Sequence, residues 1–250
     1  MRIKINCDVG HGVTLPINYN HILTGIIYQF LKQSDPEYAH FLHEKGYELE
    51  SRHFKLFTYS QLMANRRDIR GNQIRFRSPL TWYVSSPKQA FLENFAASLT
   101  QIGILQIARQ QLRVQDVEAP RTPRIDRQMT FRCLSAITIS TRRERDGKLV
   151  THYCMPDDPQ FSELVRQNLI RKYEAIYGRA PKERSFAMAF DQAYIKKRKG
   201  RVTRLIDFKG IKIRGIVCPF QVIGAPELIR VGYECGFGDK NSAGFGMVSV

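Results

Sequence analysis

Apolar residues recur at helical spacing near the start of the chain, and this pattern predicts two consecutive helices. The first is predicted over residues 19–33, with Asn18 placed to cap it. The second begins at Asp35-Pro36 and ends by Gly46. Large apolar residues on one face of each helix indicate that both pack against a core.

Strands surround these helices in the first half of the chain. Ser86-Pro87 opens a third predicted helix, and Pro79 indicates a bulge or an edge position in the strand before it. Strands are predicted over residues 1–7, 54–59, 73–84 and 104–117. The order β-α-α-β-β-α-β is the split-βαβ, or ferredoxin-like, arrangement.

A proline-containing break separates the two halves. Residues 119–128 include Pro120 and Pro123 and show no apolar periodicity, so we predict a linker there. The linker divides the chain into an N-terminal domain at residues 1–118 and a C-terminal domain at residues 129–250.

The second half again mixes strands with a helix. Asp146-Gly147 predicts a hairpin turn, and a helix is predicted from about Asp157 to Tyr177, closed by Gly178. Strands are predicted over residues 130–141, 149–154, 185–191, 193–197, 201–208, 210–217 and 228–234. This order predicts a second α+β half that resembles the first.

One stretch of 20 residues, from Gly12 to Leu31, has no formal charge and is long enough to span a membrane. Pro16 and several polar residues interrupt it, so we predict a loop followed by an amphipathic helix and no membrane span. The N-terminus alternates like a strand and does not resemble a signal peptide. The 5 Cys are scattered without a C-x-x-C pair, which favours a reducing, cytoplasmic location over a disulfide framework or a zinc site.

Charge changes the picture, because 39 Lys and Arg against 23 Asp and Glu give a net charge of +16 over 250 residues. This excess favours an acidic partner, with nucleic acid first and a membrane surface second. Half of it lies in the basic segment, residues 196–214, where the only acid is Asp207. Its basic residues are Lys196, Lys197, Arg198, Lys199, Arg201, Arg204, Lys209, Lys212 and Arg214. A strand over 210–214 would place Lys212 and Arg214 on one face and the isoleucines in the core.

A second basic cluster lies in the first half beside one acid, Asp68. Its members are Arg66, Arg67, Arg70, Arg75 and Arg77. Either cluster alone is consistent with a solvated surface. Two clusters on so basic a chain favour phosphate binding, although charge does not distinguish RNA from DNA.

Several side chains suited to proton transfer lie close together in the first half. The set is His21, Tyr28, His40, His43, His53 and Lys55. On a helical wheel, His21 and Tyr28 fall opposite the apolar stripe of the first helix, and His40 and His43 lie off the stripe of the second. Imidazole titrates near neutrality, so this set is a candidate for acid–base catalysis. The absence of H-E-x-x-H and G-x-S-x-G disfavours metal and serine hydrolysis.

The glycine-rich tail, residues 236–246, reads G-F-G-D-K-N-S-A-G-F-G. It is not G-x-G-x-x-G, because Asn241 occupies the third glycine position, and it is not a Walker loop. Glycine allows positive φ and close approach of the backbone. The tail is therefore either an anion site built from backbone N–H groups or a tight turn between two terminal strands.

This tail resembles the signature of the Cas6 family of CRISPR-associated endoribonucleases, members of the repeat-associated mysterious protein superfamily. Other segments typical of the family are L-P-I-N-Y-N-H at 15–21, L-H-E-K-G-Y at 42–47, F-K-L-F-T-Y-S at 54–60, F-K-G-I-K at 208–212 and P-E-L at 226–228. The resemblance thus covers nearly the whole chain.

The resemblance implies an α+β protein with two tandem ferredoxin-like, RRM-like domains and antiparallel sheets. It implies an endoribonuclease that binds CRISPR repeat RNA and cleaves the precursor transcript into guide RNAs. The ribose 2′-OH would attack the adjacent phosphate, leaving a 2′,3′-cyclic phosphate and a 5′-OH, with no metal or other cofactor.

The resemblance also assigns residues. Tyr28, His43 and Lys55 stand at the catalytic positions, with His43 as general acid or base and Lys55 stabilising the charge of the transition state. Two roles have alternatives. Arg52 or His53 could take the role of Lys55, and His21 or His40 could take that of His43.

RNA contact is expected through the basic segment and the glycine-rich tail. The tail residues assigned to it are Gly236, Gly238, Lys240, Gly244 and Gly246. The alternative function is a catalytically inactive subunit that holds repeat RNA in an effector complex. Other effector subunits and a second copy of the chain are further candidate partners, and a membrane is not.

Overall fold

The computed structural model describes residues 1–250, and the chain divides into two compact units. The first comprises Met1–Thr122 together with Ser242–Gly244. The second comprises Pro123–Asn241 together with Phe245–Val250. None of the helices has the combination of length and apolar character needed to cross a membrane.

A five-stranded antiparallel sheet forms the centre of the first unit, in the order β5-β8-β1-β10-β9. Its strands are β1 (Arg2–Asp8), β5 (Thr58–Tyr59), β8 (Leu80–Ser85), β9 (Ile104–Ile107) and β10 (Gln110–Glu118). Alternation along β1 buries Ile5 opposite Trp82 of β8, so one face of the sheet is apolar.

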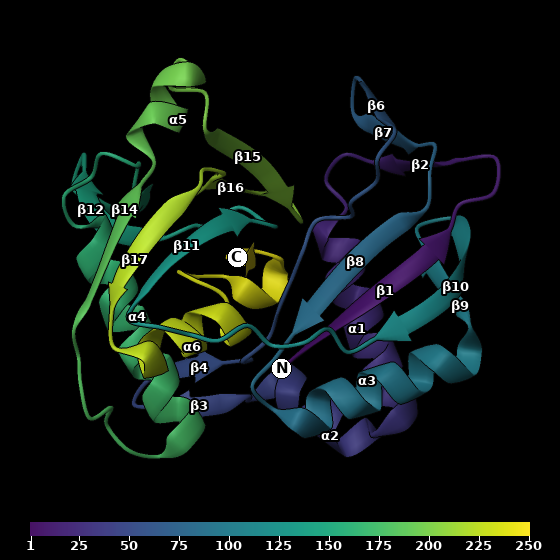
Figure 1. Ribbon diagram of the computed structural model, residues 1–250, viewed down its shortest axis with the longest axis horizontal. Coiled ribbons are helices and arrows are strands. Elements are labelled where there is room, and N and C mark those ends of the chain that lie inside the picture. Colours follow the sequence, from purple (N-terminus) through teal and green to yellow (C-terminus); the bar gives the residue numbers. More distant parts are fainter. The chain divides into compact units, whose positions relative to one another are not determined.

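Helices α1 (Asn20–Ser34) and α3 (Gln89–Ile102) cover this apolar face (Figure 1). Helix α2 (Pro36–Glu44) packs against α1. Phe95 of α3 packs in edge-to-face geometry against Phe30 of α1 and against Trp82 of the sheet. These aromatic contacts fix α1, which carries Tyr28, against the core.

Two smaller antiparallel sheets complete the first unit. One has the order β2-β7-β6 and contains β2 (Val13–Pro16), β6 (Arg67–Arg70) and β7 (Gln73–Phe76). The other pairs β3 (Tyr47–Leu49) with β4 (Arg52–Phe54), between α2 and Lys55.

The second unit is built around a four-stranded sheet in the order β14-β17-β11-β18. Its strands are β11 (Gln128–Cys133), β14 (Phe186–Phe190), β17 (Phe220–Gly224) and β18 (Val248–Ser249). Its helices are α4 (Phe161–Tyr177), α5 (Gln192–Lys197) and α6 (Pro226–Cys235). The 3-10 turn η1 (Asn241–Ala243) begins at the last residue before the Ser242–Gly244 segment of the first unit. Two hairpins, β12 (Ser140–Arg145) with β13 (Lys148–Tyr153) and β15 (Thr203–Phe208) with β16 (Ile211–Ile216), extend from it.

The two units share one topology, which confirms the predicted α+β class with ferredoxin-like sheets. In each unit the core elements follow the order strand, helix, strand, strand, helix, strand. The strands lie side by side as second, third, first and fourth, that is β5-β8-β1-β10 in one unit and β14-β17-β11-β18 in the other.

Two of the predicted strands are helices. Residues 193–197 form α5, because the Asp191 side chain accepts a hydrogen bond from Tyr194 N and starts a helix. Residues 228–234 form most of α6, which begins at Pro226, a residue favoured in the first helical turn.

Three smaller predictions are also wrong. The strand predicted over 73–84 is two strands, β7 and β8, with Pro79 in the break between them. Asn18 does not occupy the capping position of α1, which belongs to Tyr19, and the Tyr19 side chain makes no capping hydrogen bond. Ile211 is 61% exposed, so only Ile213 of that alternating strand enters the core.

A buried lysine binds the first part of the glycine-rich tail, residues 236–241, in the second unit. Lys172 Nζ donates hydrogen bonds to Gly236 O at 2.8 Å, to Gly238 O at 2.8 Å and to Asn241 Oδ1 at 2.6 Å. Burial lowers the pKa of Lys172 from 10.5 to about 8. The three N–H donors of the ammonium group match three oxygen acceptors, so this side chain determines the path of the tail.

Gly244→Ala is expected to lower the free energy of unfolding by about 2 kcal/mol or more. Gly244 has φ +82°, and a Cβ there would collide with the Tyr59 ring and lie 2.8 Å from Asn20 Nδ2. Urea denaturation measures the change. Gly103→Ala is the matched control, because Gly103 has φ +66° with open space around it. Equal losses for the two variants would show that close packing at Gly244 contributes nothing.

Candidate active site and nucleic-acid interface

Helices α1 and α2 bring Tyr28 and His43 into contact. Asp35 ends α1 and also caps α2, accepting a hydrogen bond from Tyr38 N at 2.9 Å, so the two helices are joined by a tight turn. The Tyr28 and His43 rings lie 5.2 Å apart between centroids at 82°. Phe57 packs on Tyr28 as well, with its ring centroid 6.0 Å away. The structure therefore brings together two of the residues that the resemblance assigns to the catalytic positions.

The His43 ring is oriented by its neighbour in sequence. His43 Nδ1 lies 2.8 Å from Glu44 Oε1, and this hydrogen bond lowers the pKa of the Glu44 carboxyl. A carboxylate accepts from Nδ1–H, which assigns the tautomer and leaves Nε2 for a substrate. The two side chains are 66% and 58% exposed, so Nε2 is accessible to a large ligand.

Lys55 approaches the same region from the segment after β4. Its Nζ donates a hydrogen bond to His43 O at 2.6 Å, at the last turn of α2. Partial burial lowers the pKa of Lys55, while Glu44 acts in the opposite direction. Lys55 thus places a positive charge beside His43 and also bonds a carbonyl at the end of the helix.

The backbone that carries Lys55 adopts an unusual conformation. Leu56 has φ +53°, which branched side chains rarely adopt. Ser86 Oγ donates a hydrogen bond to Leu56 O at 2.8 Å and holds this conformation. A fixed backbone here positions both Lys55 and the Phe57 ring that supports Tyr28.

Tyr28 is a neutral phenol in this setting, because burial raises its pKa well above the usual range. A neutral phenol donates a hydrogen bond readily and is a poor base. The arrangement therefore contains one hydrogen-bond donor, one imidazole and one cation.

The replacements left open by the sequence lie nearby but without this contact. His40 is exposed on α2, and Arg52 and His53 are exposed on β4, where they pair with Leu49 and Glu48. His21 is partly buried on α1. Which of these groups takes part in a reaction stays a prediction, and the ring contact favours His43.

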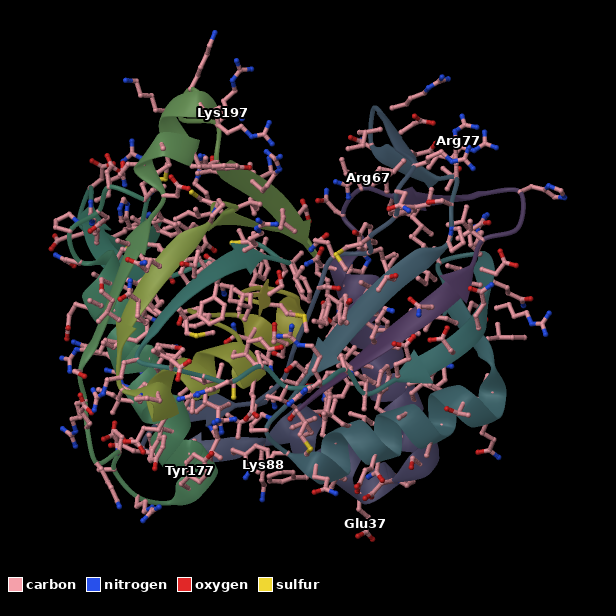
Figure 2. The ribbon with its side chains drawn as sticks, viewed as in Figure 1. Glu37, Arg67, Arg77, Lys88, Tyr177 and Lys197 are labelled. Carbon is pink, nitrogen blue, oxygen red and sulfur yellow. The ribbon has the colours of Figure 1, made fainter.

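The basic segment covers α5 and the β15–β16 hairpin, and all nine of its Lys and Arg side chains are exposed. Figure 2 shows Lys197 on α5 among other side chains that end in nitrogen. In β16, Lys212 and Arg214 flank the buried Ile213, as alternation predicts. The nine basic side chains make α5 and the β15–β16 hairpin strongly cationic.

The four glycines of the tail are buried, whereas Lys240 is exposed. A Cβ on Gly238 would collide with Thr138 O, and one on Gly246 would collide with Phe237 O. Burial favours the tight-turn interpretation, since the backbone N–H of Gly246 already donates to Ala136 O at 2.8 Å. RNA contact by these glycines stays a prediction, and Lys240 is the tail residue that solvent reaches.

Glu44 is a residue of the candidate site that the sequence does not indicate. It follows His43 directly, and side chains at i and i+1 on a helix do not normally meet. No group of three or more His, Cys, Asp or Glu side chains is placed to hold a metal ion.

Comparison with known proteins decides the family. The description "CRISPR-associated protein Cas6, N-terminal" matches residues 14–118, and "CRISPR associated protein Cas6, C-terminal" matches residues 118–250. The chain belongs to the Cas6 family. It is 33% identical to CRISPR-associated endoribonuclease Cas6 1 of Methanocaldococcus jannaschii over 99% of this chain and 92% of that protein. It is 30% identical to CRISPR-associated endoribonuclease Cas6 of Pyrococcus furiosus, over 97% and 86% of the two chains.

Solved Cas6 structures share the fold over the full length. A CRISPR associated protein Cas6 superposes with TM-score 0.80 at 31% identity, covering 100% of this chain and 98% of the other. A protein described as an RAMP protein binding different RNA substrates superposes with TM-score 0.82 at 25% identity, covering 100% and 98%. The arrangement of two ferredoxin-like units in one chain is therefore shared with solved Cas6 proteins.

Proposed function

We propose that this chain is an endoribonuclease that processes CRISPR repeat RNA without a metal ion. The observation that carries the proposal is the contact of Tyr28 with His43, with Lys55 bonded to the His43 carbonyl. A histidine, a phenol and a cation are the groups that cleavage by an internal nucleophile needs. The relatives named Cas6 endoribonucleases at 30% and 33% identity support the same activity.

The proposed reaction is a transesterification in which every proton has a destination. The ribose 2′-oxygen attacks the adjacent phosphorus and gives its proton to a base, and the bond from phosphorus to the 5′-oxygen breaks. The leaving 5′-oxygen takes a proton from an acid, which gives a 5′-OH on one product and a 2′,3′-cyclic phosphate on the other. His43 fills one of these two roles, and water fills the other. Because the nucleophile is a group of the RNA itself, the protein gains much of the rate by holding the 2′-OH in line with the leaving group.

Each side chain has a role that its geometry permits. His43 Nε2 transfers a proton as general acid or base, since Glu44 occupies Nδ1. Tyr28, a neutral phenol, donates a hydrogen bond to the reacting phosphodiester or ribose. The Lys55 ammonium stabilises negative charge on the non-bridging oxygens.

Cleavage of a labelled repeat RNA by wild-type protein, with analysis of both product ends, tests this proposal. We expect a 5′-OH that accepts a label from polynucleotide kinase, and a cyclic phosphate on the other fragment. Tight binding of the repeat with no cleavage would instead establish the alternative function, an RNA-holding subunit. A 5′-phosphate product would contradict the proposed chemistry.

Lys212→Ala combined with Arg214→Ala is expected to weaken repeat RNA binding and reduce its salt dependence. Each phosphate contact on single-stranded RNA contributes about −0.7 to the slope of log K against log salt concentration, so losing two contacts reduces its magnitude by about 1.4. Fluorescence anisotropy at several salt concentrations measures this. Arg142→Ala with Arg145→Ala on β12 removes the same charge elsewhere in the second unit. If the Arg142/Arg145 variant lost as much affinity and slope, binding would depend on the net charge of the protein and not on Lys212 and Arg214.

A further inference from the structure

The small sheet β2-β7-β6 in the first unit has two unlike faces. Ile74 and Phe76 of β7 are buried on one face. Alternation along the same strand places Gln73 and Arg75 on the other face, where both are exposed. One side of this sheet therefore belongs to the core, and the other presents polar and basic groups to solvent.

A cavity opens on the basic face. Its lining residues are Thr14, Asp68, Arg70, Gln73, Arg75 and Arg77. The register explains this set, because Arg75 lies between Thr14 on β2 and Asp68 on β6. Gln73 pairs with Arg70 one step along the same face. Three arginines thus converge on one cavity together with a hydroxyl, an amide and a single carboxylate.

The carboxylate is already occupied, which leaves two arginines for a ligand. Asp68 Oδ2 accepts a hydrogen bond from Arg77 Nε at 2.5 Å, and this bond lowers the pKa of the Asp68 carboxyl. The side chains of Arg70 and Arg75 form no hydrogen bond and no ion pair, although the charge of Asp68 acts on both at longer range. Two guanidinium groups beside a hydroxyl and an amide match the oxygen atoms of a phosphodiester.

The other arginines of this cluster, Arg66 and Arg67, do not offer their side chains to the cavity. Arg66 Nη2 donates to Arg77 O at 3.4 Å, and Arg66 does not line the cavity. Arg67 lies opposite Phe76, on the other face of the strand. Figure 2 labels Arg67 on β6 and Arg77 directly after β7. No aromatic ring lines the cavity, so the site offers nothing for a base to stack on.

We infer that Arg70 and Arg75 form a phosphate-binding subsite for the RNA backbone, in addition to the basic segment. The inference rests on the proposed function, because repeat RNA supplies the phosphate. Contacts to phosphate position a strand without reading its bases. The subsite is therefore expected to bind RNA of any sequence and to leave the chemical step unchanged.

The test compares Arg70→Ala/Arg75→Ala with wild type, using a repeat RNA that carries a 2′-deoxy residue at the cleavage site. Anisotropy across a salt series gives the affinity and the slope. Arg109→Ala/Arg121→Ala is the matched control, because both side chains are exposed in the same unit and have no polar partner. We expect the cavity variant to lose about 1.4 from the magnitude of the slope, and to bind repeat and scrambled RNA more weakly by the same factor. On the all-ribose repeat, its single-turnover cleavage rate at saturating protein should equal that of wild type.

Arg70→Lys/Arg75→Lys retains the charge and is expected to keep the wild-type slope. The inference is overturned if the alanine variant and the control pair have the same affinity and slope, or if only the scrambled RNA is affected. It is also overturned if the saturated cleavage rate falls, since the arginines would then act on the reaction itself. Failure of wild type to bind RNA at all would contradict the proposed function, a result distinct from a silent cavity variant. Thermal melts confirm that each variant is folded.

Discussion

His43→Ala is expected to lower the single-turnover rate of repeat RNA cleavage by about 100-fold or more. In the proposed mechanism the His43 imidazole transfers the proton, and its Nε2 is accessible to a substrate. Tyr28 and Lys55 remain in the variant, so positioning and charge stabilisation persist and leave a residual rate. Gel analysis of labelled RNA at saturating protein measures the effect on the chemical step.

His40→Ala is the control for this prediction, because His40 is an exposed histidine on the same helix. We expect it to cleave at nearly the wild-type rate. Both variants should bind an uncleavable RNA as wild type does, since His43 is assigned to chemistry and not to affinity. Full activity in His43→Ala together with a large loss in His40→Ala would move the general acid or base to His40.

Lys172→Met is expected to lower the free energy of unfolding by about 3 kcal/mol or more at pH 7. The substitution keeps the volume but removes all three donors, so two buried carbonyls and the Asn241 amide oxygen lose their partner. Urea denaturation measures the loss. Lys182→Met replaces an exposed lysine in the same unit and is expected to change stability by less than about 0.5 kcal/mol. A similar small change in Lys172→Met would contradict the role assigned to this lysine.

The same lysine gives stability a specific pH dependence. Its folded pKa of about 8 lies below the ordinary 10.5, so between these values the unfolded chain holds a proton that the folded chain has released. Stability therefore rises with pH across this window in wild type, by about 3 kcal/mol in full. Lys172→Met lacks this rise, so the difference between the two proteins grows from pH 8 to pH 10.5. A difference that stays constant or shrinks would show that burial does not depress this pKa.

The spacing of apolar residues predicted the helices and strands that bury one face and expose the other. Helix α1 follows its apolar stripe, and the alternation of β1 places Ile5 opposite Trp82. Helix α6 was mistaken for a strand because its apolar run, with Ile229 and Val231, contains the β-branched residues that strands favour. There, Pro226 at the first turn was the better signal.

In the candidate site, too, the sequence predicts local features but not contacts that depend on tertiary packing. The wheel placed Tyr28 on the polar face of α1, but its contact with His43 depends on how α1 and α2 pack, which no local pattern specifies. The His43–Glu44 hydrogen bond depends on the rotamers of two adjacent side chains. The assignment of His43 comes from the resemblance to Cas6. The cavity at Arg70 and Arg75 depends on the register of the β2-β7-β6 sheet, which the sequence does not reveal.

The most direct test of the account is cleavage of two matched repeat RNAs by wild-type protein in EDTA. The RNAs differ only by a 2′-deoxy residue at the cleavage site, and their binding is measured in parallel. The account predicts that the all-ribose RNA is cleaved in EDTA, and that the deoxy RNA binds equally well and stays intact. Cleavage of the deoxy RNA, or loss of all cleavage in EDTA with recovery on adding Mg²⁺, would contradict metal-independent attack by the 2′-OH.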